Sequence, residues 1–180
     1  MTQTTPEAIA EGALIEALYV HAIQPKGRFR EELLAIGLDV DRIQPRYPAQ
    51  VWVRAAYIAR RHVFAGESDA VALRSLGRLT MKGFFSTLTG KMLSATLSFV
   101  SARGFITRIP RFMKMGRPDV QVSVSWKGER EALLVMSDEA RFPAECNSGI
   151  LEEVLDRIGV VPRIKVVREL GGISELSVEW

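Results

Sequence analysis

The chain has 180 residues, of which 47% are hydrophobic and 25% are charged, and these proportions exclude a disordered protein. A chain of this length can bury a sizeable core without disulfides or metals, so we expect one domain over residues 1–180. The net charge of +3 is too small to indicate a nucleic-acid-binding protein.

Cysteine usage and the lack of targeting signals indicate the compartment. Cys146 is the only cysteine, so the chain cannot form an internal disulfide. The first seven residues lack the basic start and apolar stretch of a signal peptide. No apolar run approaches the roughly 20 residues needed to span a bilayer. We therefore expect a cytoplasmic protein that does not insert into a membrane.

Apolar residues recur at helical spacing up to about residue 118. After a loose tail over residues 1–6, residues 7–23 are compatible with a helix, although Ala13–Val20 also fits a strand. A short helix over residues 27–36 should end at Gly37, because glycine commonly terminates helices. The later expectations are a loop over 38–47, a helix from Pro48 to about Gly66, a helix over 69–88 capped by Ser68, and helices near 91–101 and 105–112.

After residue 118 the apolar residues alternate with polar ones, which is typical of strands with one buried face. The expected elements are a strand over 120–126, a turn over 127–129, a strand over 130–136, a helix from Asn147 or Ser148 to Ile158 that stops at Gly159, a strand over 163–169, a Gly171-Gly172 hairpin and a final strand that buries Leu176, Val178 and Trp180. The pattern predicts an α+β fold, with a helical half over 1–118 and a four-stranded antiparallel sheet crossed by one helix (ββαββ) over 119–180.

Residues that carry catalytic chemistry do not form a recognisable motif. His21 and His62 lack the spacing of metal ligands, so no metal is expected. A helix amino terminus at Cys146 would lower the pKa of its thiol, but nothing places a histidine beside it. Asp138 and Glu139 follow a strand, where loop residues often have functions, yet adjacent loop acids usually face solvent. The sequence therefore predicts a protein that is not an enzyme and has no cofactor.

The most unusual segment is residues 103–117, which contains five basic residues and no acidic one. Arginine suits carboxylates and phosphates, so an anionic ligand or an acidic partner is one interpretation. The other is a solvated basic rim around a short core helix. If a ligand binds there, the candidate residues are Arg108, Arg111, Lys114, Phe112 and Met113.

Two further groups of residues have two interpretations each. Gly77, Gly83 and Gly90 lie in a helical pattern, where they favour close helix packing over space for a ligand. Methionines and phenylalanines are abundant, and these form either an adaptable pocket or an ordinary core. They are Met81, Met92, Met113, Met115, Met136, Phe84, Phe85, Phe99 and Phe112.

Several short motifs resemble a family of unknown function that is expanded into many paralogues in myxobacteria. They are Gly37-Leu-Asp-Val-Asp41, Tyr47-Pro48 with Trp52, and Leu76-Gly77-Arg78 with Gly83, Thr87 and Gly90. The resemblance covers nearly the whole chain and implies no established activity.

More distantly, the chain is similar to heme-nitric-oxide/oxygen-binding (H-NOX) domains. The segments that carry this likeness are Gly12–Leu18, Leu76-Gly77-Arg78, Phe112–Val120 and Gly149–Leu155. The likeness implies a helical half followed by an antiparallel sheet with a helix across it. The chain departs from these domains at the heme, because no histidine lies between residues 63 and 180. Their Tyr-x-Ser-x-Arg contact with the heme propionates is matched at most by Ser137, so we expect no histidine-ligated heme.

Three hypotheses follow, and the third, an enzyme, would require a constellation around Cys146, Asp138 or Glu139 that the sequence does not show. The first is a heme-less sensor or adaptor domain that binds a small apolar or anionic ligand between its halves, with residues 103–117 at the rim. The second is a protein-interaction module, as a homodimer or with another protein, that has no small-molecule ligand.

Overall fold

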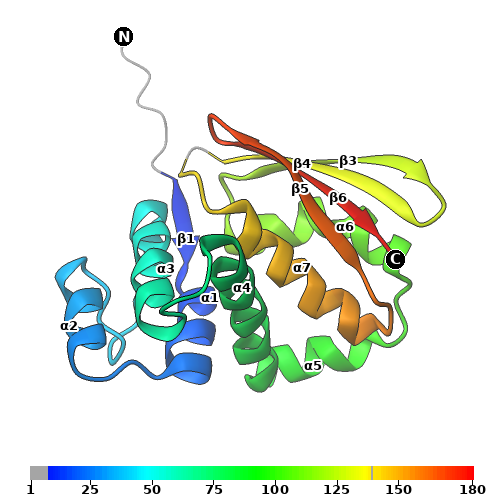
Figure 1. Ribbon diagram of the computed structural model, residues 1–180. Helices are drawn as coiled ribbons and strands as arrows, with labels where there is room; N and C mark the ends of the chain where they lie inside the picture. The colour runs from blue at the N-terminus through cyan, green and yellow to red at the C-terminus, as the bar shows by residue number, and fades with distance from the viewer. Residues whose placement is uncertain (1–7, 139) are drawn as a thin grey trace, which may run out of the picture.

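The computed structural model describes residues 8–138 and 140–180, so the expected tail over residues 1–6 lies outside it. Apart from two short paired strands, the described chain is helical up to Gly116 and then forms a sheet interrupted by one helix, which confirms the predicted α+β class (Figure 1). In chain order the elements are β1 (Ile9–Glu11), α1 (Gly12–Glu16), the π-helix η1 (Ala17–Ile23), α2 (Arg28–Ala35), β2 (Arg46–Pro48), α3 (Ala49–Val63), α4 (Asp69–Ser86), α5 (Leu88–Leu97), α6 (Ala102–Gly116), β3 (Gln121–Gly128), β4 (Glu131–Ser137), α7 (Ala144–Ile158), β5 (Arg163–Leu170) and β6 (Ile173–Glu179).

The four later strands form an antiparallel sheet in the order β3-β4-β6-β5. The side chains of β4 and β6 alternate between buried and partly exposed, so one face of the sheet covers a core. Helices α6 and α7 pack on that face (Figure 1). The predicted hairpin at Gly171 and Gly172 is confirmed, since both residues have positive φ and connect β5 to β6.

Helix α4 lies at the centre of the fold, where it packs against η1, α3, α5 and α7. Two glycines allow the closest approach. A methyl group at Gly77 would overlap the carbonyl oxygen of Cys146 in α7, and one at Gly83 would overlap that of Ala17 in η1. The glycines of this helix therefore serve close helix packing, as the sequence favoured.

The amino-terminal segment differs from its prediction. The alternative strand over Ala13–Val20 is wrong, because these residues are helical and bury Ile15, Leu18 and Tyr19. A strand precedes them instead at β1, and it pairs with β2, which begins in the expected loop over 38–47 and ends at Pro48. Pro48 ends β2 rather than beginning α3. This pairing joins segments more than thirty residues apart, so local sequence does not reveal it.

Three helices, α5, α6 and α7, begin at least three residues before their expected starts. Helix α5 begins at Leu88, because the Thr87 hydroxyl accepts a hydrogen bond from the Gly90 amide at 3.0 Å. Helix α6 extends from Ala102 to Gly116, three residues earlier and four later than its prediction.

Helix α7 begins at Ala144, so the expected cap at Asn147 or Ser148 is wrong and both residues lie buried inside the helix. A carboxylate oxygen of Glu169 in β5 accepts from the Ala144 amide at 2.9 Å. This cap comes from a distant strand. The expected end at Gly159 is confirmed, with a φ of 92°. Among residues 8–138 and 140–180, no helix has the length and apolar character that crossing a membrane requires.

Candidate functional site

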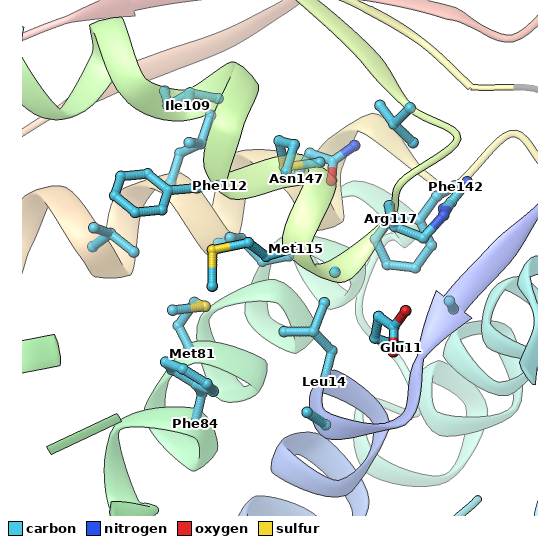
Figure 2. A pocket seen from close by; sticks show the side chains of 18 of the residues that line it. Glu11, Leu14, Met81, Phe84, Ile109, Phe112, Met115, Arg117, Phe142 and Asn147 are labelled. Atoms are coloured by element: carbon cyan, nitrogen blue, oxygen red, sulfur yellow. The ribbon is translucent and has the colours of Figure 1, made fainter. Parts of the chain in front are cut away.

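A cavity of about 320 Å³ lies between the amino-terminal helices and the helices under the sheet (Figure 2). Its walls are mostly apolar and come from both parts of the chain. They include Leu14, Trp52, Met81, Phe84, Phe85, Leu93, Leu97, Phe105, Ile109, Phe112, Met113, Met115, Val120, Phe142, Ile150, Leu151 and Val154.

Helical periodicity brings these side chains together. Phe105, Ile109, Phe112 and Met113 recur three or four residues apart and form one face of α6. Figure 2 shows Ile109 and Phe112 of this face opposite Met81 and Phe84, which project from α4. A third wall comes from α7. The result is an apolar chamber between helices, a usual location for small-molecule sites.

The cavity opens to solvent between α1, α5 and α6. Ala13, Thr89 and Met115 line it and are themselves exposed. Met115 is 70% exposed, which is unusual for a large apolar side chain. A flexible thioether at this opening can move aside without breaking a hydrogen bond.

A buried ion pair forms one wall of the cavity. The Arg117 guanidinium donates to both carboxylate oxygens of Asp138, at 3.3 and 2.5 Å, and to both of Asp119, at 3.1 and 2.7 Å. Asp138 also accepts from the backbone amides of Ala140 and Phe142, at 2.9 and 2.8 Å. The carboxylates hold the pKa of Arg117 above its usual value although burial opposes this. This network fixes the loop that places Phe142 in the cavity wall.

Asn147 is the other buried polar side chain of the lining. It is 7% exposed, and no residue that the structure describes forms a hydrogen bond with its carboxamide. The side chain lies among those that line the cavity (Figure 2). It is therefore a polar group available to a ligand.

The structure separates the five residues that the sequence proposed for ligand binding. Phe112 and Met113 line the cavity. Arg108, Arg111 and Lys114 lie on the exposed side of α6 and are absent from the lining. The three exposed basic residues thus do not line the chamber, and the remaining basic residue of the lining, Arg117, is paired with two carboxylates.

The residues weighed for catalysis lie apart. Cys146 is buried in the first turn of α7, and burial raises the pKa of its thiol, so the expectation of a lowered pKa is wrong. His62 stacks on Phe29 with ring centroids 4.7 Å apart. The Nε2 atom of His21 lies 3.7 Å from the Oε1 atom of Glu16. Neither histidine lines the cavity. Within the described ranges, no three histidine, cysteine, aspartate or glutamate side chains gather as a metal site requires.

Several lining residues were not identified from the sequence. Leu14 and Trp52 belong to amphipathic patterns that look the same whether they face a core or a cavity. The abundance of methionine and phenylalanine was the useful signal, because Met81, Met113 and Met115 line the chamber. Met92, Met136 and Phe99 do not, and spacing alone could not separate these two groups.

Comparison with solved structures shows similarity to H-NOX domains. An H-NOX protein from S. oneidensis in the Fe(II)NO ligation state is 13% identical, with a TM-score of 0.69, and the match covers 94% of this chain and 98% of that one. An unliganded Fe(II) H-NOX protein from K. algicida is 10% identical with a TM-score of 0.63, covering 94% and 95%. An oxygen-binding H-NOX domain related to soluble guanylate cyclases is 11% identical with a TM-score of 0.64, covering 93% and 90%.

At such low identities this likeness concerns the fold alone. It confirms the distant resemblance that the sequence indicated. No curated protein matches the chain. The model of one protein family, described as a protein of unknown function (DUF2378), matches residues 8–180. The chain therefore belongs to the DUF2378 family.

Proposed function

We propose that this protein is a non-enzymatic sensor or adaptor domain that binds a small, mostly apolar ligand in the chamber between its halves. The cavity of about 320 Å³, with apolar walls and an opening at Met115, is the observation that supports this function. An engineered apolar cavity of about 150 Å³ binds benzene, so the chamber has room for a larger molecule. Burying such a ligand contributes roughly 25 cal/mol per Å² of apolar surface.

The residues present do not fit a histidine-ligated heme. One similar solved structure concerns heme redox potential and porphyrin distortion, and heme iron needs an axial ligand. His21 and His62 lie outside the lining, and Cys146 does not line it either. Arg117, the charged donor that could receive a propionate, already binds Asp119 and Asp138. We therefore propose a heme-less domain. Protein mixed with hemin and then dialysed should show no Soret band, and a band that persists would contradict this.

Binding of naphthalene tests the proposed function. Met113 lines the cavity and Met92 is exposed on α5 outside it, so the two form a matched pair. Equilibrium dialysis should show one molecule of naphthalene bound to the wild-type protein and to M92W. The M113W variant should bind at least about ten times more weakly, because the indole occupies the chamber.

Equal binding by M113W and M92W would place naphthalene elsewhere and contradict the proposal, provided that both variants unfold cooperatively. Failure of the wild-type protein to bind naphthalene would contradict a binding site for an apolar molecule in the chamber.

One observation favours the alternative, a protein-interaction module. Leu88, Met92 and Phe99 are 77%, 60% and 91% exposed, and they lie along the outer side of α5 and the turn after it. Exposed apolar side chains that gather on one surface often mark interfaces.

A homodimer through this surface is the simplest form of the alternative. Light scattering after size exclusion would then give twice the mass of the 180-residue chain, and F99E would return the protein to a monomer. A wild-type monomer at all concentrations would contradict the homodimer.

A further inference from the structure

Asn147 has an unusual environment for a buried amide. It is the fourth residue of α7, and its side chain is more than nine-tenths buried among apolar cavity walls. Its backbone amide bonds to the carbonyl of Pro143 at 3.3 Å, but no described residue bonds to its carboxamide. The carboxamide keeps some accessible surface, and the side chain lines the cavity, so the group can be reached from inside it. A molecule in the cavity is the remaining source of a partner.

The other polar side chains of the lining are already committed or lie at the opening. Arg117 and Asp138 bind each other, and Asp138 has two backbone donors as well. Glu11 pairs with Arg46 at 3.0 Å. Thr89 is exposed at the rim. Asn147 is thus the single uncommitted polar side chain deep in the described lining.

Water satisfies this amide poorly. A buried water molecule typically makes about three hydrogen bonds to protein. Most of the residues that share the lining with Asn147 have side chains of carbon and sulfur atoms alone, for example Ile109 and Met113. A ligand that supplies one polar group together with an apolar body suits the chamber better, because the same molecule also fills the apolar volume.

The charges around the chamber decide the class of that ligand. A carboxylate or phosphate inside would face Asp138 and would find no unpaired cation in the described lining, since Arg117 is shared by two carboxylates. Removing an unpaired charge from water costs far more than one hydrogen bond returns. Arg108, Arg111 and Lys114 are exposed and do not line the chamber.

We propose that Asn147 is the polar recognition residue of the chamber, and that the ligand is a neutral, mostly apolar molecule with one hydrogen-bonding group, a hydroxyl or a carbonyl, that meets the Asn147 carboxamide. This inference rests on the proposed function. It narrows the ligand from an apolar or anionic molecule to a neutral one. A carboxamide donates and accepts, so it can bind either group.

Three probes with the same ring system test the inference: naphthalene, β-naphthol and β-naphthoate. The measured quantity is the ratio of the dissociation constant of β-naphthol to that of naphthalene. In N147L this ratio should rise about 3–10-fold, which is the loss of one neutral hydrogen bond. Naphthalene should bind N147L as well as it binds the wild-type protein. N147A should show the same rise in the ratio, which guards against a misfolded leucine variant.

T80V is the matched control. Thr80 is also a buried polar residue, but its hydroxyl bonds to the carbonyl of Leu76 and lies outside the lining. The ratio should be unchanged in T80V. β-Naphthoate should bind the wild-type protein at least about ten times more weakly than β-naphthol, because its charge has no partner.

An unchanged ratio in N147L and N147A would overturn the role of Asn147 while leaving the chamber as a binding site. Binding of β-naphthoate as tightly as β-naphthol would overturn the neutral class. If none of the three probes binds the wild-type protein, the proposed function fails, and this inference fails with it.

Discussion

The buried Arg117 side chain connects the linker between α6 and β3 to the loop after β4. It pairs with Asp119 in its own linker and with Asp138 in that loop. Removing one partner of a buried pair leaves an uncompensated charge, and this costs more than the pair contributes. The wall of the chamber near Phe142 therefore depends on Arg117.

Replacing Arg117 by alanine should lower the free energy of unfolding by about 3–5 kcal/mol, measured by urea denaturation. Arg168 is the control, because its pair with Glu175 at 3.4 Å is at the surface, where such pairs contribute about 0–1 kcal/mol. A loss in R117A as small as that in R168A would show that the buried network does not stabilise the fold.

The Cys146 thiol predicts a dependence of stability on pH. Burial raises its pKa in the folded state, whereas the unfolded thiol ionises near pH ~8.5. Above that pH the unfolded state has lost a proton that the folded state keeps, so the free energy of unfolding decreases as the pH rises. The contribution of the buried, protonated thiol to the free energy of unfolding is fully present below pH ~8.5. Above that pH it decreases by up to about 1.4 kcal/mol per pH unit.

C146A should lack this slope between about pH 8 and pH 9.5, a range below the ionisation of unfolded tyrosine. Urea unfolding at several pH values measures it. Identical slopes for C146A and the wild-type protein would mean that the folded thiol also ionises.

At the scale of elements, the contact between α4 and α7 depends on two glycines that face each other's helix. A methyl group at Gly77 would overlap the backbone of Cys146, and one at Gly149 would overlap the carbonyl of Arg74. Around them Arg74 donates to Glu145 at 2.7 Å and to Glu152 at 3.0 Å, so charged pairs line the same contact. The two helices are thus held by close backbone packing and by ion pairs at its edge.

Replacing Gly149 by alanine should destabilise the protein by about 1–3 kcal/mol, because the helices must move apart. Intrinsic propensity alone predicts the opposite, since alanine favours a helix by about 1 kcal/mol over glycine. In G128A the new methyl group would lie 3.9 Å from the Glu131 Cβ, so thermal unfolding should change little. A more stable G149A would show that the contact is looser than the structure indicates.

The success of sequence-based prediction differed between elements for physical reasons. The sheet was predictable because alternation, the Gly171-Gly172 hairpin and the helix end at Gly159 are all local signals. The start of α7 was not, since its first amide is capped by Glu169 from β5. The pairing of β1 with β2 was not predicted for the same reason, because the two strands lie far apart along the chain.

At the scale of the whole molecule, the chamber exists because α6 and α7 turn apolar faces toward the amino-terminal helices without filling the space between them. The sequence supplied Phe112 and Met113 as candidate residues, but it also proposed three basic residues of α6 that do not line the chamber. Composition indicates which side chains suit a pocket. Whether they leave a space is a property of packing in three dimensions, and Trp52 and Asn147 were recognisable only there.

The methionine methyl groups report directly on whether this chamber binds a ligand. Met81, Met113 and Met115 line it. Met92 lies on the surface of α5, and Met136 is buried in strand β4 outside the lining. Proton–carbon correlation spectra of the methionine methyl groups are recorded while β-naphthol is added. The resonances of Met81, Met113 and Met115 should shift together, and those of Met92 and Met136 should not move. Shifts confined to Met92, or no shifts at concentrations where dialysis detects binding, would contradict a ligand site in the chamber.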